Sequence, residues 1–197
     1  MHSPARLLHP DELTAFHAAR TDLYQAIFEL LRMPPQAALL SELRQGLCES
    51  AARQEQHRAA AELEGALSAV EQSRASGDYA QLFCGDAPCV RMRCANPGCR
   101  HRTEAFAASS VLCAEERVGE LRVLGLLAQK TVDALAAGCV PEASILTDVQ
   151  GRFLGNHAGE CLGQLVTGLR AGGSSLYSRV GVALGWLLEE DLKLLGY

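Results

Sequence analysis

Residues 10–35, PDELTAFHAARTDLYQAIFELLRMPP, contain the pattern that decides the fold class. Pro10 suits the first turn of a helix, and Pro34 disfavours a helical conformation in the residue before it. Between the prolines, the apolar residues recur mostly at steps of three and four, which places them on one face of a helix. They are Leu13, Phe16, Leu23, Ile27, Leu30 and Leu31. We therefore expect an amphipathic helix over residues 10–33.

The same period continues through most of the chain. The expected helices span residues 10–33, 35–47, 49–73, 79–83, about 115 to 137, 142–169 and 175–195. Glycine-containing breaks or kinks are expected at Ser76-Gly77, Gly138, Gly151 or Gly155, and Gly172-Gly173. Asp78 is expected to cap the helix at 79–83, and Ser174 or Ser175 the last helix.

No segment alternates with a period of two, so the sequence predicts no sheet. The expected fold class is all-α, with two packed helical lobes. The N-terminal lobe spans residues 1–113 and includes a cysteine-rich loop at 84–113, and the C-terminal lobe spans residues 114–197. A chain of 197 residues is long enough to bury such a core without disulfides.

The charge and the hydropathy of the chain indicate its expected cellular compartment and exclude some classes of partner. The net charge is −5, and no basic stripe is present that would neutralise phosphates, so we expect no nucleic-acid partner. No apolar run approaches the roughly 18 residues of a membrane span. The N-terminus lacks the charged and apolar regions of a secretory signal. We therefore expect a cytoplasmic protein with no membrane partner, in which the eight cysteines do not form disulfides.

The motifs of common enzyme classes are missing. The sequence contains no GxxxxGK[ST] phosphate loop, no GxGxxG after a strand, no GxSxG elbow and no HExxH helix. The six histidines are dispersed. Glu189-Glu190-Asp191 is predicted to be a solvated helix face, because acid–base catalysis needs carboxylates in different environments. We therefore expect that the protein is not an enzyme.

Four cysteines, Cys84, Cys89, Cys94 and Cys99, are each five residues from the last. Short spacers between thiolates are typical of zinc sites, and an iron–sulfur cluster would use the same ligands. The predicted metal ligands are Cys89, Cys94, Cys99 and Cys113; His101 or Cys84 are alternatives to complete the set. The competing interpretation is that Cys84 packs as a helix residue and the others bind nothing.

Several segments, taken in order, resemble one family. Asp78–Gly85, DYAQLFCG, is similar to the (E/D)YxxLFxG segment of TorD-like proteins, the cytoplasmic chaperones of molybdoenzymes of the dimethyl sulfoxide reductase class. The other similar segments are Arg20–Tyr24 in the first helix, Glu115–Gln129 in the place of an acidic helix, Phe153-Leu154-x-x-His157, and Tyr177–Leu195 in the last helix. The resemblance implies an all-α fold of two lobes joined by a hinge.

The resemblance also implies a function and a set of site residues. Such a chaperone binds the apo catalytic subunit of a molybdoenzyme, or its twin-arginine signal peptide, before the cofactor is inserted. The candidate client-binding residues are an acidic rim and an apolar wall, comprising Asp78, Glu115, Glu116, Glu120, Tyr79 and Phe83. The alternatives are capping or solvated carboxylates for the acids, and core packing for the two rings. The family resemblance allows a monomer or a homodimer.

One departure from the family bears on client recognition. TorD-like proteins commonly follow the LFxG segment with a loop resembling PPYESVY, whereas Ala87–Cys94 carries cysteines and arginines instead. The alternative from a different class is a redox-responsive regulator that binds zinc or an iron–sulfur cluster. In such a protein the cysteine-rich loop would be the working part, because thiolates near arginines are reactive.

Overall fold

The computed structural model describes residues 10–53, 58–68, 72–84 and 119–195 of the chain. Most of the described residues lie in helices, with short turns at 33–36, 137–139 and 172–174, and no strand occurs among the described residues. This confirms the predicted all-α class. The elements are α1 (Pro10–Arg32), α2 (Ala37–Arg53), α3 (Arg58–Ser68), α4 (Gln72–Phe83), α6 (Gly119–Ala136), α7 (Val140–Phe153), the π-helical turn η1 (Leu154–Ala158), α8 (Gly159–Ala171) and α9 (Ser175–Leu194).

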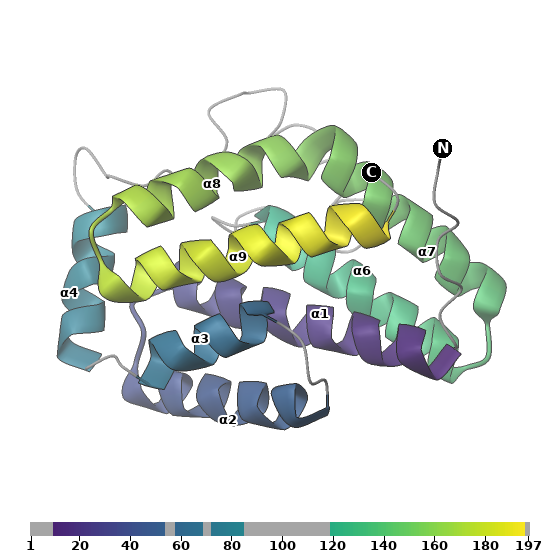
Figure 1. Cartoon of the computed structure of the whole chain (residues 1–197), viewed down its shortest axis with the longest axis horizontal. Coiled ribbons are helices and arrows are strands. Elements are labelled where there is room, and N and C mark those ends of the chain that lie inside the picture. Colours follow the sequence, from purple (N-terminus) through teal and green to yellow (C-terminus); the bar gives the residue numbers. More distant parts are fainter. Residues whose placement is uncertain (1–9, 54–57, 69–71, 85–118, 196–197) are drawn as a thin grey trace.

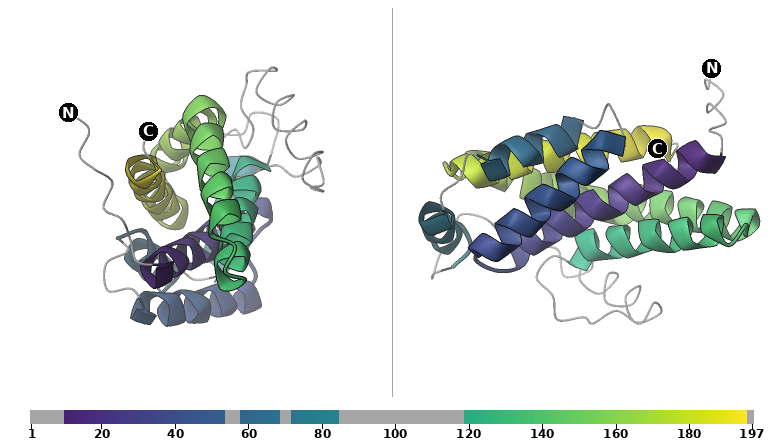
Figure 2. Two further views of the ribbon diagram at one scale, coloured as in Figure 1. Left: turned by 90° about the vertical axis from the view of Figure 1, so that its right-hand side faces the viewer. Right: turned by 90° about the horizontal axis from the view of Figure 1, so that it is seen from below.

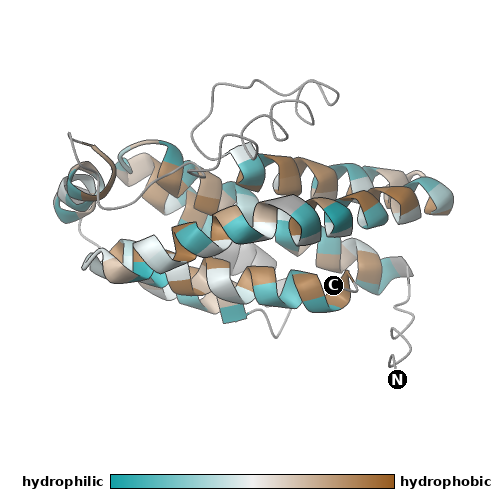
Figure 3. Ribbon diagram, turned by 90° about the horizontal axis from the view of Figure 1, so that it is seen from above, coloured by the Kyte–Doolittle hydropathy of each residue, from teal (hydrophilic) through white to brown (hydrophobic). Residues whose placement is uncertain are grey.

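The long helices lie side by side in a bundle (Figure 1). α1 packs along α6, α6 packs on α7, and α9 lies between α3 and α8. α2 covers α1 and α3 from outside, as the two further views show (Figure 2). α4 stands across one end of the bundle instead of running along it. Hydrophilic and hydrophobic positions alternate along the ribbons of the helices (Figure 3), as expected where one face of a helix is polar and the other apolar.

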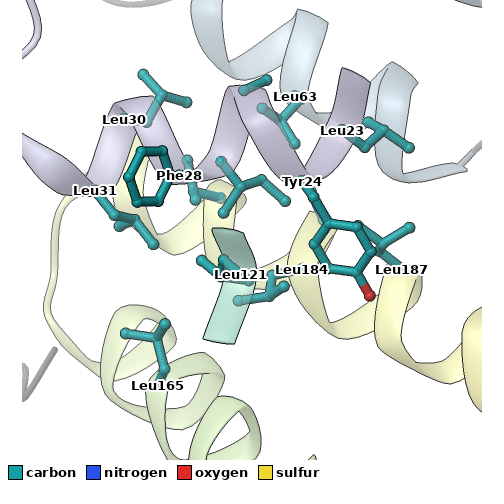
Figure 4. Packing of buried hydrophobic residues seen from close by; sticks show 14 of the residues in the cluster. Leu23, Tyr24, Phe28, Leu30, Leu31, Leu63, Leu121, Leu165, Leu184 and Leu187 are labelled. Carbon is teal, nitrogen blue, oxygen red and sulfur yellow. The ribbon is translucent and has the colours of Figure 1, made fainter. Parts of the chain in front are cut away.

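One hydrophobic cluster fills the space between the helices. Figure 4 shows Leu184 and Leu187 of α9 beside Tyr24 of α1 and Leu121 of α6. Other fully buried members include Leu23, Ile27, Leu30, Leu31, Leu63, Leu124 and Leu154. Elements from both sides of residue 113 therefore share one core. The predicted boundary between two lobes lies at residues 113 and 114, outside the described residues, and stays a prediction.

The structure corrects the predicted helices in the first half of the chain. No single helix spans residues 49–73, because residues 49–53 belong to α2 and residues 58–68 to α3, and these two helices pack against each other. The break predicted at Ser76-Gly77 is also wrong, since α4 runs from Gln72 through both residues to Phe83. Serine, glycine and aspartate are poor helix formers, but packing against a neighbour often overrides propensity.

Turn and cap predictions in the second half are confirmed. Gly138 has a positive φ of 72°, and the amides of Gly138 and Cys139 donate to the carbonyls of Leu135 and Ala134. These bonds form a Schellman motif, which satisfies the last carbonyls of α6. The kink predicted at Gly151 or Gly155 corresponds to η1, a π-helical turn between α7 and α8.

The turn between α8 and α9 depends on two glycines and a serine. Gly173 has a φ of 76°, a region that favours glycine. Ser174 is the N-cap of α9, and its hydroxyl accepts a hydrogen bond from the amide of Tyr177. Gly172 lies directly against α4, because an added Cβ atom would meet a methyl group of Leu82, which would have to shift. This turn is therefore also the surface on which α4 rests.

Among the helices that the structure describes, none combines the length and the apolar character needed to cross a bilayer.

Candidate functional site

The two aromatic residues expected to bind a client are packed against the bundle. Tyr79 is 2% exposed and Phe83 is 6% exposed. The Tyr79 and Phe83 ring centroids lie 4.9 Å apart, and Phe83 meets Tyr177 of α9 edge to face with centroids 5.1 Å apart. These three residues form a ring cluster that joins α4 to α9. Both α4 rings thus pack in the core here, which was the alternative to client binding.

The tyrosine hydroxyls of the ring cluster reach the end of α1. Tyr79 donates to the carbonyl of Arg32 at 3.1 Å, and Tyr177 donates to the carbonyl of Leu30 at 3.3 Å. Carbonyls in the last turn of a helix lack an amide partner within the helix. Burial, and then the nearby Tyr79 and Asp78, raise the pKa of Tyr177 well above its usual value. The Tyr177 hydroxyl therefore stays protonated and able to donate.

Asp78 does not have the capping role that was predicted, and its assignment to client binding stays a prediction. It lies inside α4, not at its N-terminus, so the predicted N-cap is wrong. Its carboxylate accepts a hydrogen bond of 2.6 Å from the Ser174 hydroxyl. The same hydroxyl oxygen accepts from the amide of Tyr177 at 3.3 Å. Asp78 thereby ties α4 to the first turn of α9.

The acidic rim is described only in part. Glu120 lies in the first turn of α6 and is half-buried. A carboxylate at this position interacts favourably with the helix dipole. Glu115 and Glu116 lie outside the described residues. The assignment of these three acids to client binding stays a prediction.

The predicted metal ligands Cys89, Cys94, Cys99 and Cys113 also lie outside the described residues, as does His101. Cys84 directly follows α4 and is exposed. Within the described part of the chain, no three His, Cys, Asp or Glu side chains gather as a metal site would require. Zinc or an iron–sulfur cluster at the cysteine-rich loop stays a prediction.

A buried ion pair between the first and last helices is the feature that the sequence interpretation missed. Arg20 donates from Nε to Oδ1 of Asp191 and from Nη2 to Oδ2, both at 2.6 Å. Neither side chain is exposed to solvent. The Tyr24 hydroxyl donates to the same Oδ2 at 2.6 Å. Asp191 is therefore not part of a solvated acidic face, although Glu189 is exposed and pairs with Lys193 as such a face would.

Arg20 extends this network to α6 and α7 through its third guanidinium nitrogen. Its Nη1 donates to Oε1 of Gln150 at 2.5 Å. The amide nitrogen of Gln150 donates in turn to the Thr131 hydroxyl at 2.8 Å and to the carbonyl of Leu127 at 3.2 Å. Burial alone would lower the pKa of Arg20, but the pairing with Asp191 raises it above its ordinary value. One charge pair thus joins α1, α6, α7 and α9.

His17 completes the network and leaves one polar atom unpaired. Its Nδ1 lies 3.0 Å from Nη1 of Arg20, which can only donate, so Nδ1 is the acceptor and Nε2 carries the proton. Nε2 is buried and has no hydrogen-bond partner among the described residues. Burial, followed by the charge of Arg20, lowers the pKa of His17 to about 3. The ring is therefore neutral at physiological pH.

A sequence signal for the ion pair was present. Arg20 lies four residues after Phe16 and three before Leu23, on the apolar face of its helix. Asp191 lies in the same way between Leu187 and Leu195. A charged residue on an apolar face must find a partner when it is buried. Opposite charges on the apolar faces of two long helices therefore predict a buried pair.

The neutral state of His17 predicts a pH dependence of stability. The pKa is about 6.5 in the unfolded chain and about 3 in the folded protein, so the unfolded state binds more protons between these values. The free energy of unfolding should therefore fall as the pH is lowered from 6.5 towards 3, by about 1–2 kcal/mol between pH 7 and pH 5. Urea denaturation at both pH values measures this difference, and His17→Gln should remove most of it. An equal pH dependence in the variant would contradict the assignment.

No family model, no curated protein and no solved structure matches this chain.

Proposed function

We propose that this protein is a cytoplasmic chaperone that binds the apo catalytic subunit of a molybdopterin-containing oxidoreductase, or its twin-arginine signal peptide, before cofactor insertion. The proposal rests on the ordered resemblance to TorD-like proteins. The observation that supports it most is where the resembling segments lie. The 78–85 and 177–195 segments meet in the ring cluster, and the 20–24 and 177–195 segments meet in the Arg20–Asp191 pair.

The chemistry of a signal peptide fits the charge of this chain. A twin-arginine signal is a short basic segment followed by an apolar one. A helical surface with acidic and apolar side chains binds such a segment as an amphipathic element. The net charge of −5 favours the approach of two arginines, and complementary charge acts mainly on the association rate. In this proposal Glu115, Glu116 and Glu120 meet the arginines. The protein acts as a binding protein without its own catalytic centre, as a monomer or a homodimer.

An anaerobic affinity capture from the native host tests the proposal. The tagged full-length protein is recovered, its partners are identified by mass spectrometry, and its metal content is measured by elemental analysis. The proposal predicts a molybdoenzyme precursor that lacks its molybdenum cofactor. A preparation with stoichiometric zinc or iron and no such precursor would favour the metal-dependent regulator instead.

A charge-matched pair of variants tests the acidic rim. Glu115→Gln/Glu116→Gln/Glu120→Gln should lower the amount of captured precursor by about threefold or more at low salt, because rim charges steer association. The control, Glu42→Gln/Glu142→Gln/Asp148→Asn, removes the same charge from exposed positions on α2 and α7. Quantitative mass spectrometry of the captured precursor measures both. An equal loss of captured precursor in the two variants would mean that the net charge of the protein, and not the acidic rim, attracts the precursor.

A further inference from the structure

The position of α4 differs from that of the other helices. It stands across one end of the bundle (Figures 1 and 2). Its contacts with the bundle are made largely by side chains of its C-terminal half. Leu82 rests over Gly172, Asp78 holds Ser174, and Tyr79 and Phe83 pack on Tyr177. The Ser76 hydroxyl adds one bond to the carbonyl of Pro35 at 3.3 Å. α4 is therefore fixed at one corner of the fold.

The helix itself is weak. α4 has 12 residues, and an isolated helix of about this length is marginal in water even with good helix formers. Ser76, Gly77 and Asp78 follow one another in its middle, and each has low helix propensity. An added Cβ atom at Gly77 would meet nothing within 4 Å, and the residue is exposed. Packing does not require glycine there, so Gly77 lowers the stability of α4 without serving its contacts.

The corner of the bundle retains its own bonds when α4 leaves. Ser174 would still cap the amide of Tyr177, and Tyr177 would still donate to Leu30. The carbonyls of Leu31 and Arg32, which accept from Tyr79, lie at a helix end where water can replace the hydroxyl. The buried network around Arg20 contains no residue of α4. Undocking therefore leaves few buried polar groups without partners.

We propose that α4 is a displaceable strap, which leaves its docked position as one unit while the bundle of α1, α6, α7, α8 and α9 stays folded. Undocking uncovers Tyr79 and Phe83 on α4 and the face of Tyr177 on α9. Local openings of this kind have lower free energies than global unfolding. One consequence rests on the proposed function: a client reaches Tyr79 and Phe83 only after α4 has undocked, so the docked state holds the client-binding rings out of reach.

Native-state hydrogen exchange with mass spectrometry tests the strap. Amides of residues 75–83 should exchange about tenfold or more faster than those of the buried middle of α9. Gly77→Ala should slow exchange in α4 by about two- to fivefold, because alanine favours the helix. The matched control is Gly163→Ala, an exposed glycine of α8 whose added Cβ atom also meets nothing within 4 Å. This control should leave exchange in α4 unchanged.

A variant with the opposite effect completes the test. Gly172→Ala places a methyl group against Leu82 and should speed exchange in α4 several-fold more than in α9. The strap is overturned if α4 exchanges at the rate of α9, or if the three variants change exchange throughout the protein alike.

Client capture by the same variants separates the two proposals. Gly77→Ala should capture less precursor than the wild-type protein, and Gly163→Ala should capture the same amount. If exchange identifies the strap but no variant captures a precursor, the proposed function fails and the strap stands. If precursor is captured equally by all variants, the role of the strap in client binding is wrong.

Discussion

Asp191→Asn is expected to lower the free energy of unfolding by about 3–5 kcal/mol, because it leaves a buried charge without its partner. The change is nearly isosteric, so it leaves the packing of α9 in place. It removes the negative charge that compensates Arg20, whose side chain is fully buried. It also replaces Oδ2, which accepts from Tyr24, or Oδ1, which accepts from Arg20, by a nitrogen that cannot accept.

Urea denaturation followed by circular dichroism measures this loss. The control is Glu189→Gln, which removes a charge two residues earlier in the same helix but from an exposed pair with Lys193. We expect no change in its urea midpoint, because exposed ion pairs contribute little. Arg20→Met should cost a similar amount to Asp191→Asn, and the double variant should lose less than the sum of both. A loss below about 1 kcal/mol for Asp191→Asn would contradict a buried charge pair.

Leu184→Ala is expected to cost about 2–5 kcal/mol, from lost burial and from the cavity left behind. Leu184 has no exposed surface and lies in the core between α9 and its neighbours (Figure 4). Leu194→Ala in the same helix is the matched control, because Leu194 is 51% exposed. The same denaturation experiment measures both variants, and their midpoints should differ clearly. Equal effects would mean that α9 does not present the face to the core that the structure assigns to it.

The sequence predicted the helices whose apolar faces are regular. The steps from Leu13 to Leu31 and the prolines at 34 and 35 closely matched the bounds of α1. Gly138 and Ser174 correctly predicted a helix end and a helix start, because their roles depend on local backbone conformation and on hydrogen bonds within a few residues. Such features need no knowledge of distant contacts.

The errors lie where distant contacts decide the outcome. Gly77 favours a break locally, but α4 remains helical because Leu82 and the ring cluster dock on a turn almost a hundred residues later. Asp191 looked solvated beside two glutamates, but its partner, Arg20, lies 171 residues away. The burial of Tyr79 and Phe83 depends on the same long-range docking. A single sequence does not show which of its helices will meet, so the burial of these two rings could be weighed only as an alternative.

The most direct test of the proposed function is the cofactor content of molybdoenzymes in the native host with and without this gene. We predict that deletion leaves at least one enzyme of the dimethyl sulfoxide reductase class present as polypeptide but without its molybdenum cofactor. The wild-type gene should restore the cofactor. Unchanged cofactor content and activity of every such enzyme in the deletion strain would contradict the proposal.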